Sequence, residues 1–158
     1  MPADTALSPY EISDDPARID ADAAHAYLTR SYWAAGIPKS VVERAIRGSL
    51  CFGVYHEGAQ IGFARVVTDA TTFAYLADVY ILEPHRGQGL SKRLLAAIVA
   101  HPQLQCLRRF LLATRDAHGL YRQFGFDGLA RPERLMEISN PDPYGPLAAA
   151  AASVPPRP

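Results

Sequence analysis

The residues of this chain best suited to chemistry form one short segment, Arg86-Gly87-Gln88-Gly89-Leu90-Ser91. The segment follows an apolar stretch typical of a buried strand and precedes an amphipathic stretch typical of a helix. At a helix start the backbone N–H groups lack intrahelical partners, and the helix dipole favours an anion. The two glycines let the backbone approach that anion, and the arginine adds a planar cationic donor. The segment therefore predicts a binding site for a diphosphate.

Three kinds of phosphate-binding loop have patterns that can be compared with this segment. A nucleotide-hydrolase loop needs Gly-Lys-Ser/Thr after its spacer, and the sequence lacks it. A dinucleotide-binding fingerprint needs a third glycine where Lys92 stands, and an acidic residue near the end of the next strand. Neither of these is present. The remaining pattern, Arg-x-x-Gly-x-Gly/Ala after a long buried strand, matches except that Ser91 takes the last place.

A second motif follows later in the chain, Ala117-His118-Gly119-Leu120-Tyr121-Arg122-Gln123-Phe124-Gly125-Phe126. The two motifs, in this order and with their flanking elements, resemble the GNAT superfamily of acetyl-CoA-dependent N-acetyltransferases. The first is similar to that family's pyrophosphate loop, and the second to its Ala-x-x-Leu-Tyr-x-x-x-Gly-Phe element. The resemblance covers about residues 8–139 and implies a GNAT fold, an α/β (α+β) architecture with a mixed, mostly antiparallel sheet. It also implies a splayed parallel strand pair and helices on both faces.

The resemblance implies where acetyl-CoA lies along the chain. The cofactor is expected to pair with the backbone of Val79, Tyr80 and Ile81 as an extra strand would. Its diphosphate is expected at the backbone N–H groups of the loop. The remaining expected contacts are Thr114, which stands where many relatives have Asn, and Tyr121. The cofactor-binding set is thus Val79, Tyr80, Ile81, Arg86, Gly87, Gln88, Gly89, Leu90, Ser91, Thr114 and Tyr121.

Acetyl transfer from a thioester to an amine needs a neutral amine, a donor for the oxyanion and a proton for the departing thiolate. A backbone N–H near Val79–Ile81 is expected to serve the oxyanion. Tyr121 is the candidate acid, because its reference pKa (~10) exceeds that of a thiol (~8.5). Helix spacing alone favours a core tyrosine, and the surrounding motif reverses that preference.

Asp78 interrupts an otherwise apolar strand beside the expected acetyl site. A buried carboxylate without a partner is costly, so its presence needs a cause. One hypothesis is that it receives the amine proton through water or binds the ammonium. The other is that it pairs with Arg65 or another strand residue, and the sequence leaves both open.

The acceptor-binding residues are expected outside the cofactor crevice. Trp33, the only tryptophan, follows the first helix and forms either a pocket wall or a core anchor. Phe73 and Tyr75 begin the central strand and are expected to face the same space, together with Asp78. No residue identifies the acceptor itself.

The elements that position these residues follow from turn signals and apolar periodicity. A first strand is expected at Tyr10–Ser13, a helix capped by Asp20 or Asp22, and a second short helix that opens near Ser40 and ends at Gly48. Three strands follow, Leu50–Tyr55, Ile61–Val67 and Phe73–Leu82.

In the second half, a helix is expected over Leu90–Ala100, a strand over Arg109–Thr114 and a helix over Asp116–Phe124, with Asp116 as its cap. The crossover between the two strands should be right-handed and parallel. A last hairpin is expected from Phe126-Asp127 to a strand at Leu135–Ser139. Residues 1–139 therefore form an N-acetyltransferase domain, and the Pro/Ala-rich residues 140–158 a flexible tail.

Composition limits the possible partners and the compartment. Lys plus Arg and Asp plus Glu both number 16, which argues against a nucleic-acid binder with a broad basic field. No apolar run approaches the ~20 residues that span a bilayer, so no membrane partner is expected. Cys51 and Cys106 lack metal-type spacing, and no signal peptide is evident, so we expect a cytoplasmic protein without a metal. Dimers are common among similar proteins, so a homodimer is left open.

The sequence favours an N-acetyltransferase that moves the acetyl group from acetyl-CoA to a primary amine of a small molecule. The amine would attack the thioester directly, through a tetrahedral intermediate. Two alternatives stay open, a protein or peptide N-acetyltransferase and a non-catalytic sensor that binds acyl-CoA.

Overall fold

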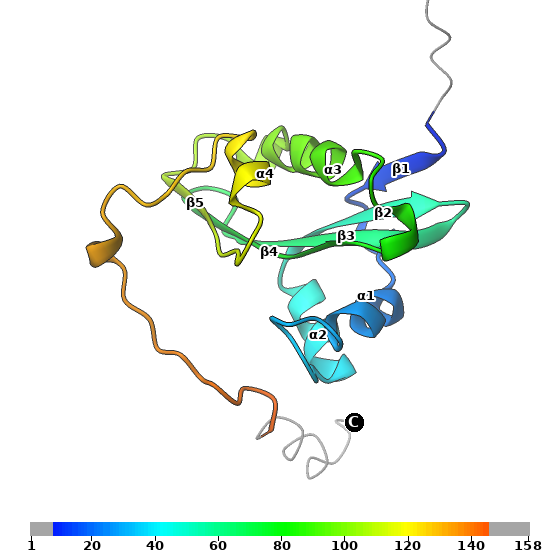
Figure 1. Cartoon of the computed structure of the whole chain (residues 1–158), viewed down its shortest axis with the longest axis horizontal. Coiled ribbons are helices and arrows are strands. Elements are labelled where there is room, and N and C mark those ends of the chain that lie inside the picture. Colours follow the sequence, from blue (N-terminus) through cyan, green and yellow to red (C-terminus); the bar gives the residue numbers. More distant parts are fainter. Residues whose placement is uncertain (1–7, 146–158) are drawn as a thin grey trace, which may run out of the picture.

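The computed structural model describes residues 8–145, in which five strands form one sheet with helices on both faces (Figure 1). The first four strands pair antiparallel, and the last two pair in parallel. This confirms the mixed, mostly antiparallel sheet with one parallel pair. In sheet order, which is also chain order, the strands are β1 (Tyr10–Ser13), β2 (Leu50–His56), β3 (Ala59–Thr68), β4 (Phe73–Ile81) and β5 (Arg109–Leu112).

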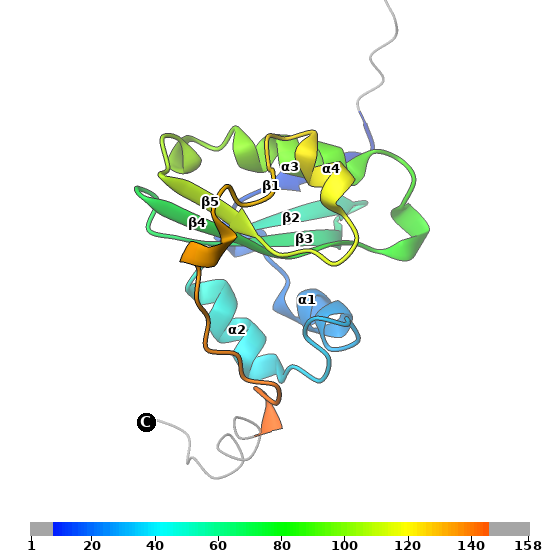
Figure 2. The same ribbon diagram turned by 60° about the vertical axis from the view of Figure 1, so that its left-hand side comes forward.

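Two helices cover each face of the sheet (Figures 1 and 2). One face carries α1 (Ala21–Leu28) and α2 (Lys39–Arg47), and the other carries α3 (Leu90–Val99) and α4 (His118–Arg122). Asp20 caps α1 as expected, because its carboxylate accepts the N–H of Ala23 at 3.0 Å.

Each face of the sheet has its own apolar core. Leu94, Leu95 and Ile98 of α3 are fully buried on one face, while Leu28 of α1 and Phe63 of β3 are fully buried on the other. Burying one such side chain contributes roughly 1.5–3 kcal/mol to folding. The sheet is therefore held from both sides, which makes it a firm support for groups at its strand ends.

A β-bulge interrupts the pairing of β3 with β4. Phe63 lies opposite Tyr80 and Arg65 lies opposite Ala77, so two residues of β4 oppose one of β3. The first of the two is Asp78, whose φ of 58° lies in the left-handed region, where Asp is tolerated better than most residues. In a regular strand residue 78 would share the face of α3. The bulge instead turns its side chain toward α1 and α2.

The parallel strands β4 and β5 pair over only four residues each. Phe73–Leu76 lies beside Arg109–Leu112, and β4 then continues to Ile81 paired with β3 alone. The edge of β4 from Ala77 onward therefore has no β5 partner, and the two strands open toward the loop before α3.

Two expectations about the C-terminal half are wrong. Strand β5 ends at Leu112 rather than Thr114, because the chain leaves β4 there. Residues 135–139 form no strand, and the side chains of Met136 and Ile138 are fully exposed. A 3-10 turn at Pro132–Arg134 breaks the expected hairpin, since proline cannot donate to a strand ladder. Residues 146–158, most of the expected tail, lie outside the described residues.

Candidate active site

The loop before α3 presents its backbone N–H groups without a competing side chain. Gly89 is the N-cap of α3 and has a φ of 73°, and no side chain caps the helix. Gly87 has a φ of 79°. A Cβ added at either glycine would meet no atom within 4 Å, so the conformation, not crowding, requires glycine. The loop thus offers uncapped N–H groups and a helix dipole to an anion.

Two side chains of the loop hold it in place through hydrogen bonds to residues outside the loop. The Arg86 guanidinium donates from Nε to the Ile81 carbonyl at 2.8 Å and from Nη2 to the Tyr27 hydroxyl at 2.9 Å. Gln88 donates to the hydroxyl of Tyr10 at 3.0 Å. Arg86 therefore fixes the end of β4 to α1, and Oε1 of Glu83 lies 4.0 Å from its Nη2, so its charge is directed at these partners rather than held free for an anion. Its bond to Ile81 also occupies a carbonyl that the sequence assigned to cofactor pairing.

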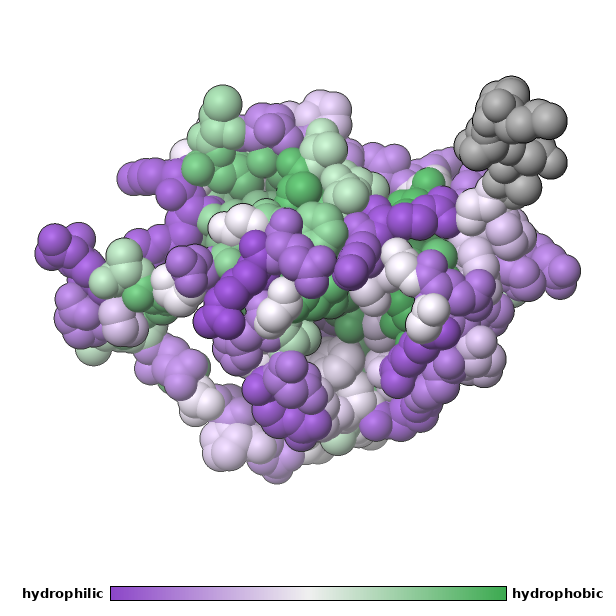
Figure 3. All heavy atoms as spheres, turned by 45° about the horizontal axis from the view of Figure 1, so that its top comes forward, coloured by the Kyte–Doolittle hydropathy of each residue, from purple (hydrophilic) through white to green (hydrophobic). Residues whose placement is uncertain are grey.

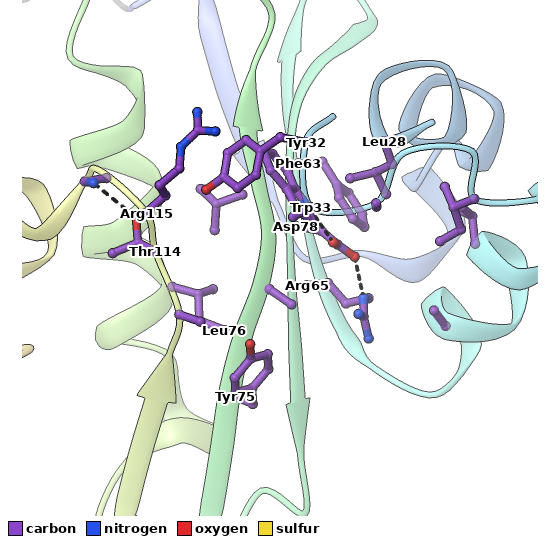
Figure 4. Close-up of a pocket in the computed structure, with 18 of the residues that line it drawn as sticks. Leu28, Tyr32, Trp33, Phe63, Arg65, Tyr75, Leu76, Asp78, Thr114 and Arg115 are labelled. Atoms are coloured by element: carbon purple, nitrogen blue, oxygen red, sulfur yellow. Dashed lines mark hydrogen bonds and ion pairs between the residues drawn. The ribbon is translucent and has the colours of Figure 1, made fainter. Parts of the chain in front are cut away.

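A cavity of about 590 Å³ opens between the end of β5, the bulge in β4 and the helices α1 and α2 (Figure 4). Most of its wall is apolar. Its charged side chains are Arg65, Asp78, Arg115 and Asp116. Four tyrosines and a tryptophan also contribute to the wall, namely Tyr32, Trp33, Tyr75, Tyr121 and Tyr144.

Asp78 lies at the centre of this cavity and has two protein partners (Figure 4). Its Oδ2 lies 2.8 Å from Nε of Arg65, and its Oδ1 accepts the indole N–H of Trp33 at 3.0 Å. The Asp78 side chain is 12% exposed. The carboxylate pairs with Arg65, as the structural hypothesis predicts, and it also lines the cavity, where the hypothesis of an amine-binding role requires it. Each oxygen keeps a lone pair for a further donor.

Tyr121 reaches the cavity from α4, on the side of the β4–β5 opening. Burial raises the pKa of its hydroxyl above the ordinary tyrosine value, and the nearby Tyr32 raises it further. Within residues 8–145 the hydroxyl forms no hydrogen bond. Tyr121 therefore stays protonated at neutral pH and can donate to a group in the cavity.

Thr114 holds the start of α4. Its hydroxyl oxygen accepts the N–H of Ala117, the N-cap residue of α4, at 3.1 Å. Within the described part of the chain no side chain caps α4 itself, so the expected cap at Asp116 is wrong. Arg115, the residue after Thr114, lies with its guanidinium 3.9 Å from the ring centre of Tyr32. This cation–π contact joins the segment after α1 to the segment before α4 across the cavity.

The cavity brings together the predicted catalytic and acceptor residues except Phe73, and two more of the predicted cofactor contacts. Trp33, Tyr75, Asp78, Val79, Thr114 and Tyr121 all line the cavity. Phe73 does not line it, and its side chain is 39% exposed elsewhere on β4. Tyr80 points into the core below α1, stacked on Tyr27 at 3.9 Å, so only its backbone could meet a cofactor.

Sequence reasoning overlooked Tyr144 altogether. It is half-buried against the core beneath α1 and α2, and it contributes to the cavity wall. The available signal was a single aromatic residue in a segment otherwise rich in Pro, Ala and polar residues.

Two further searches of residues 8–145 gave no candidates. No group of three or more His, Cys, Asp or Glu side chains lies close enough to hold a metal ion. No helix in this part of the chain is long and apolar enough to cross a membrane.

Comparison with known proteins identifies the family. The sequence profile of the acetyltransferase (GNAT) family matches residues 10–126. A candidate acetyltransferase from Gibberella zeae is 35% identical over 136 residues, which cover 71% of this chain and 75% of that protein. The crystal structure of a candidate GNAT acetyltransferase from Xanthomonas campestris is 49% identical, with a TM-score of 0.84 over 86% of this chain and 96% of that one.

A more distant structure shares the fold. It is a Clostridium acetobutylicum acetyltransferase with acetyl-CoA, 15% identical, with a TM-score of 0.59 over 82% of this chain and 94% of that one. The match of the family profile to most of the described residues, with the loop and cavity in the places that the two motifs indicate, leads to one conclusion. This chain belongs to the acetyltransferase (GNAT) family and is an acyltransferase.

Proposed function

We propose that this protein transfers the acetyl group of acetyl-CoA to the primary amine of a small molecule, by direct attack of the amine on the thioester. The main support for the proposal is that Asp78 and Tyr121 line one cavity, at the place where β4 and β5 separate. That place lies between a loop suited to a diphosphate and a pocket suited to an amine.

The residues present fit acetyl-CoA. The uncapped start of α3 and the left-handed Gly87 and Gly89 suit its diphosphate. The free edge of β4 beyond Ala77 suits the amide groups of its pantetheine arm, which can pair as a strand would. Relatives from Clostridium acetobutylicum and Elizabethkingia anophelis were crystallised with acetyl-CoA, which supports the same donor here.

Tyr121 is proposed as the acid that protonates the departing thiolate. Because burial raises its pKa, the hydroxyl keeps its proton at neutral pH and can donate it to sulfur. The oxyanion that forms during attack would be stabilised by a backbone N–H near Val79, where the bulge has loosened the strand pairing.

Asp78 is proposed to bind the amine as its ammonium and to take part in removing its proton. Arg65 and Trp33 hold the carboxylate in place and leave a lone pair on each oxygen. The released proton passes to Asp78 or through water to solvent, and the neutral amine then attacks.

The half-open, mostly apolar cavity of about 590 Å³ has the size of a small-molecule site, which favours a small molecule over an extended peptide as acceptor. The test is release of coenzyme A thiol from acetyl-CoA in the presence of a panel of small primary amines and of lysine peptides. We expect turnover with small amines. Turnover with the peptides alone would replace the small-molecule assignment, and no turnover with any amine would contradict the proposal.

We also propose that the protein is a homodimer. Among the described residues β5 forms the edge of the sheet, and apolar side chains gather over β5 and α4 (Figure 3). The extended segment after the turn at Pro132–Arg134 adds Leu135, Met136 and Ile138, which are 41%, 98% and 103% exposed. A second copy that covers these side chains would lower the cost of their exposure. Light scattering should give twice the monomer mass, and a monomer mass would contradict this.

A cytoplasmic location is proposed from the two cysteines. Cys51 is buried and Cys106 is exposed, and both are free thiols, which favours a reducing compartment. Cell fractionation with an antibody to the chain tests this location.

A further inference from the structure

The C-terminal segment crosses from one side of the cavity to the other. After α4 the chain leaves the β5 side of the molecule, makes the 3-10 turn at Pro132–Arg134, and runs extended toward α2 (Figures 1 and 2). Between the turn and Asn140 its side chains are exposed. At Pro143 and Tyr144 the chain becomes half-buried again. The segment therefore makes contact with the body at its far end, beside the acceptor side of the cavity.

Tyr144 is the residue that makes this contact. Its side chain packs against the core that includes Leu28 of α1 and Val42 of α2, and it lines the cavity. Burial and the charge of Asp78 raise the pKa of its hydroxyl, and Arg65 opposes the rise. Tyr144 thus lies within the electrostatic reach of the same ion pair that we assign to the amine.

The composition of the cavity wall then limits the acceptor. Toward α1 and α2 the wall consists of aliphatic side chains, namely Leu28, Ile37, Val41, Val42 and Ile46. Trp33, Tyr75 and Tyr144 add aromatic surface around Asp78. Arg65 already pairs with one oxygen of Asp78, and Trp33 donates to the other. The lone pair that each oxygen keeps, next to aromatic and aliphatic wall, suits an ammonium attached to an apolar skeleton. A polyhydroxylated amine would leave many of its hydroxyl groups without partners at such a wall.

We infer that Tyr144 is a specificity-determining residue of the acceptor site, and that this site takes a primary amine on an apolar or aromatic skeleton. The inference rests on the proposed function and extends it. Tyr144 forms one wall of the site, and its aromatic ring covers the apolar part of the amine. The ring, rather than the hydroxyl, supplies most of the contact.

The first experiment measures acetylation kinetics with 2-phenylethylamine as the probe. Tyr144→Ala should raise the KM for this amine about tenfold, because it removes an aromatic wall. It should leave the KM for acetyl-CoA within about twofold, because Tyr144 lies away from the α3 loop. Tyr144→Phe keeps the ring and should behave like the wild type. Glu137→Ala, on the exposed part of the same segment, is the matched control and should change nothing.

A second experiment gives a readout that does not depend on turnover. Trp33 is the only tryptophan and donates to Asp78, so its fluorescence should report binding of 2-phenylethylamine to the protein in the presence of coenzyme A. The Kd should rise about tenfold in Tyr144→Ala and in a chain that ends at Asn140, and should stay unchanged in Glu137→Ala. Circular dichroism checks that each variant is folded.

The outcomes separate this inference from the proposed function. Equal Kd and KM for 2-phenylethylamine in the wild type and Tyr144→Ala would overturn the role of Tyr144 while leaving the acetyltransferase in place. Acetylation of glucosamine without binding of 2-phenylethylamine would overturn the apolar class of acceptor. Failure of the wild type to acetylate any amine would instead contradict the proposed function itself.

Discussion

The α3 loop and the acceptor cavity show two ways in which a chain can build a binding site. The loop is a run of six residues, Arg86–Ser91, whose proposed ligand groups are backbone N–H groups fixed by two left-handed glycines. The cavity is built from side chains that lie on five segments, between Leu28 and Tyr144. The loop needs only local sequence, whereas the cavity needs the whole fold. We therefore expect substitutions in the loop to affect acetyl-CoA, and substitutions in the cavity wall to affect the amine.

We expect the largest loss of activity from a substitution of Tyr121, which should slow the chemical step without weakening acetyl-CoA binding. Tyr121→Phe removes the proposed acid without removing the ring, and it should lower kcat by about 10²-fold. The Kd for acetyl-CoA should stay within about twofold, because the loop is untouched. Stopped-flow and steady-state thiol release on an accepted amine measure the change.

Tyr121→Phe with wild-type kcat would make Tyr121 a wall residue only. Tyr32→Phe serves as the matched control, since its hydroxyl belongs to the same cavity but has no assigned proton transfer. It should lower kcat by less than about threefold.

A substitution of Asp78 tests whether its carboxylate binds the amine or only pairs with Arg65, and we expect a smaller loss of activity than at Tyr121. Asp78→Asn keeps the size of the side chain and suits the left-handed backbone at this position, but it removes the negative charge. We expect the kcat/KM for the amine to fall about 30-fold, because the ammonium loses its counter-charge. Amine-dependent thiol release at saturating acetyl-CoA gives this ratio.

Arg65→Gln is the paired variant for Asp78. If the carboxylate binds the amine, Arg65→Gln should cost less activity than Asp78→Asn, because Asp78 remains. Equal losses of thermal stability with no loss of kcat/KM in either variant would assign Asp78 to structure alone.

A change in the loop should affect the donor and spare the acceptor. Gly89→Ala places a Cβ on a residue with a φ of 73°, which strains the N-cap of α3. The Kd for acetyl-CoA should rise about tenfold, while the amine affinity reported by Trp33 fluorescence should stay the same. Gly119→Ala, at a glycine of α4 with ample space, is the control. An altered amine affinity in Gly89→Ala would break the distinction between the two regions.

We expect the smallest change in the KM for the amine at Phe73, which the sequence analysis placed in the acceptor site. Because its side chain does not line the cavity, Phe73→Ala should change the KM for the amine by less than about twofold. Tyr75→Ala, two residues along β4 and part of the cavity wall, should raise that KM several-fold. A larger effect at Phe73 than at Tyr75 would require a different acceptor path.

The sequence predicted most of the fold because its signals are local. Asp20 caps α1, Gly48 ends α2, and the turn at His56–Gln60 joins two strands that pair as expected. The prediction of a strand at Leu135–Ser139 was wrong, because an alternating apolar pattern forms a strand only if the edge of another strand is within reach. The 3-10 turn at Pro132 carries this segment away from β5.

Within the site, local motifs predicted the loop and Tyr121, and the surrounding fold determined the rest. The bulge that turns Asp78 toward Arg65 depends on a mismatch between β3 and β4 that neither strand reveals alone. Tyr144 is separated from the cavity by an extended segment, and sequence periodicity carries no information about where such a segment returns.

In the proposed mechanism, the start of α3 holds the diphosphate of acetyl-CoA and thereby aims the thioester at Tyr121. Isothermal titration of acetyl-CoA into the wild-type protein tests this arrangement. We expect one site per chain with micromolar affinity, weakened in Gly89→Ala and unchanged in Tyr121→Phe. Absence of binding at millimolar acetyl-CoA would contradict this arrangement.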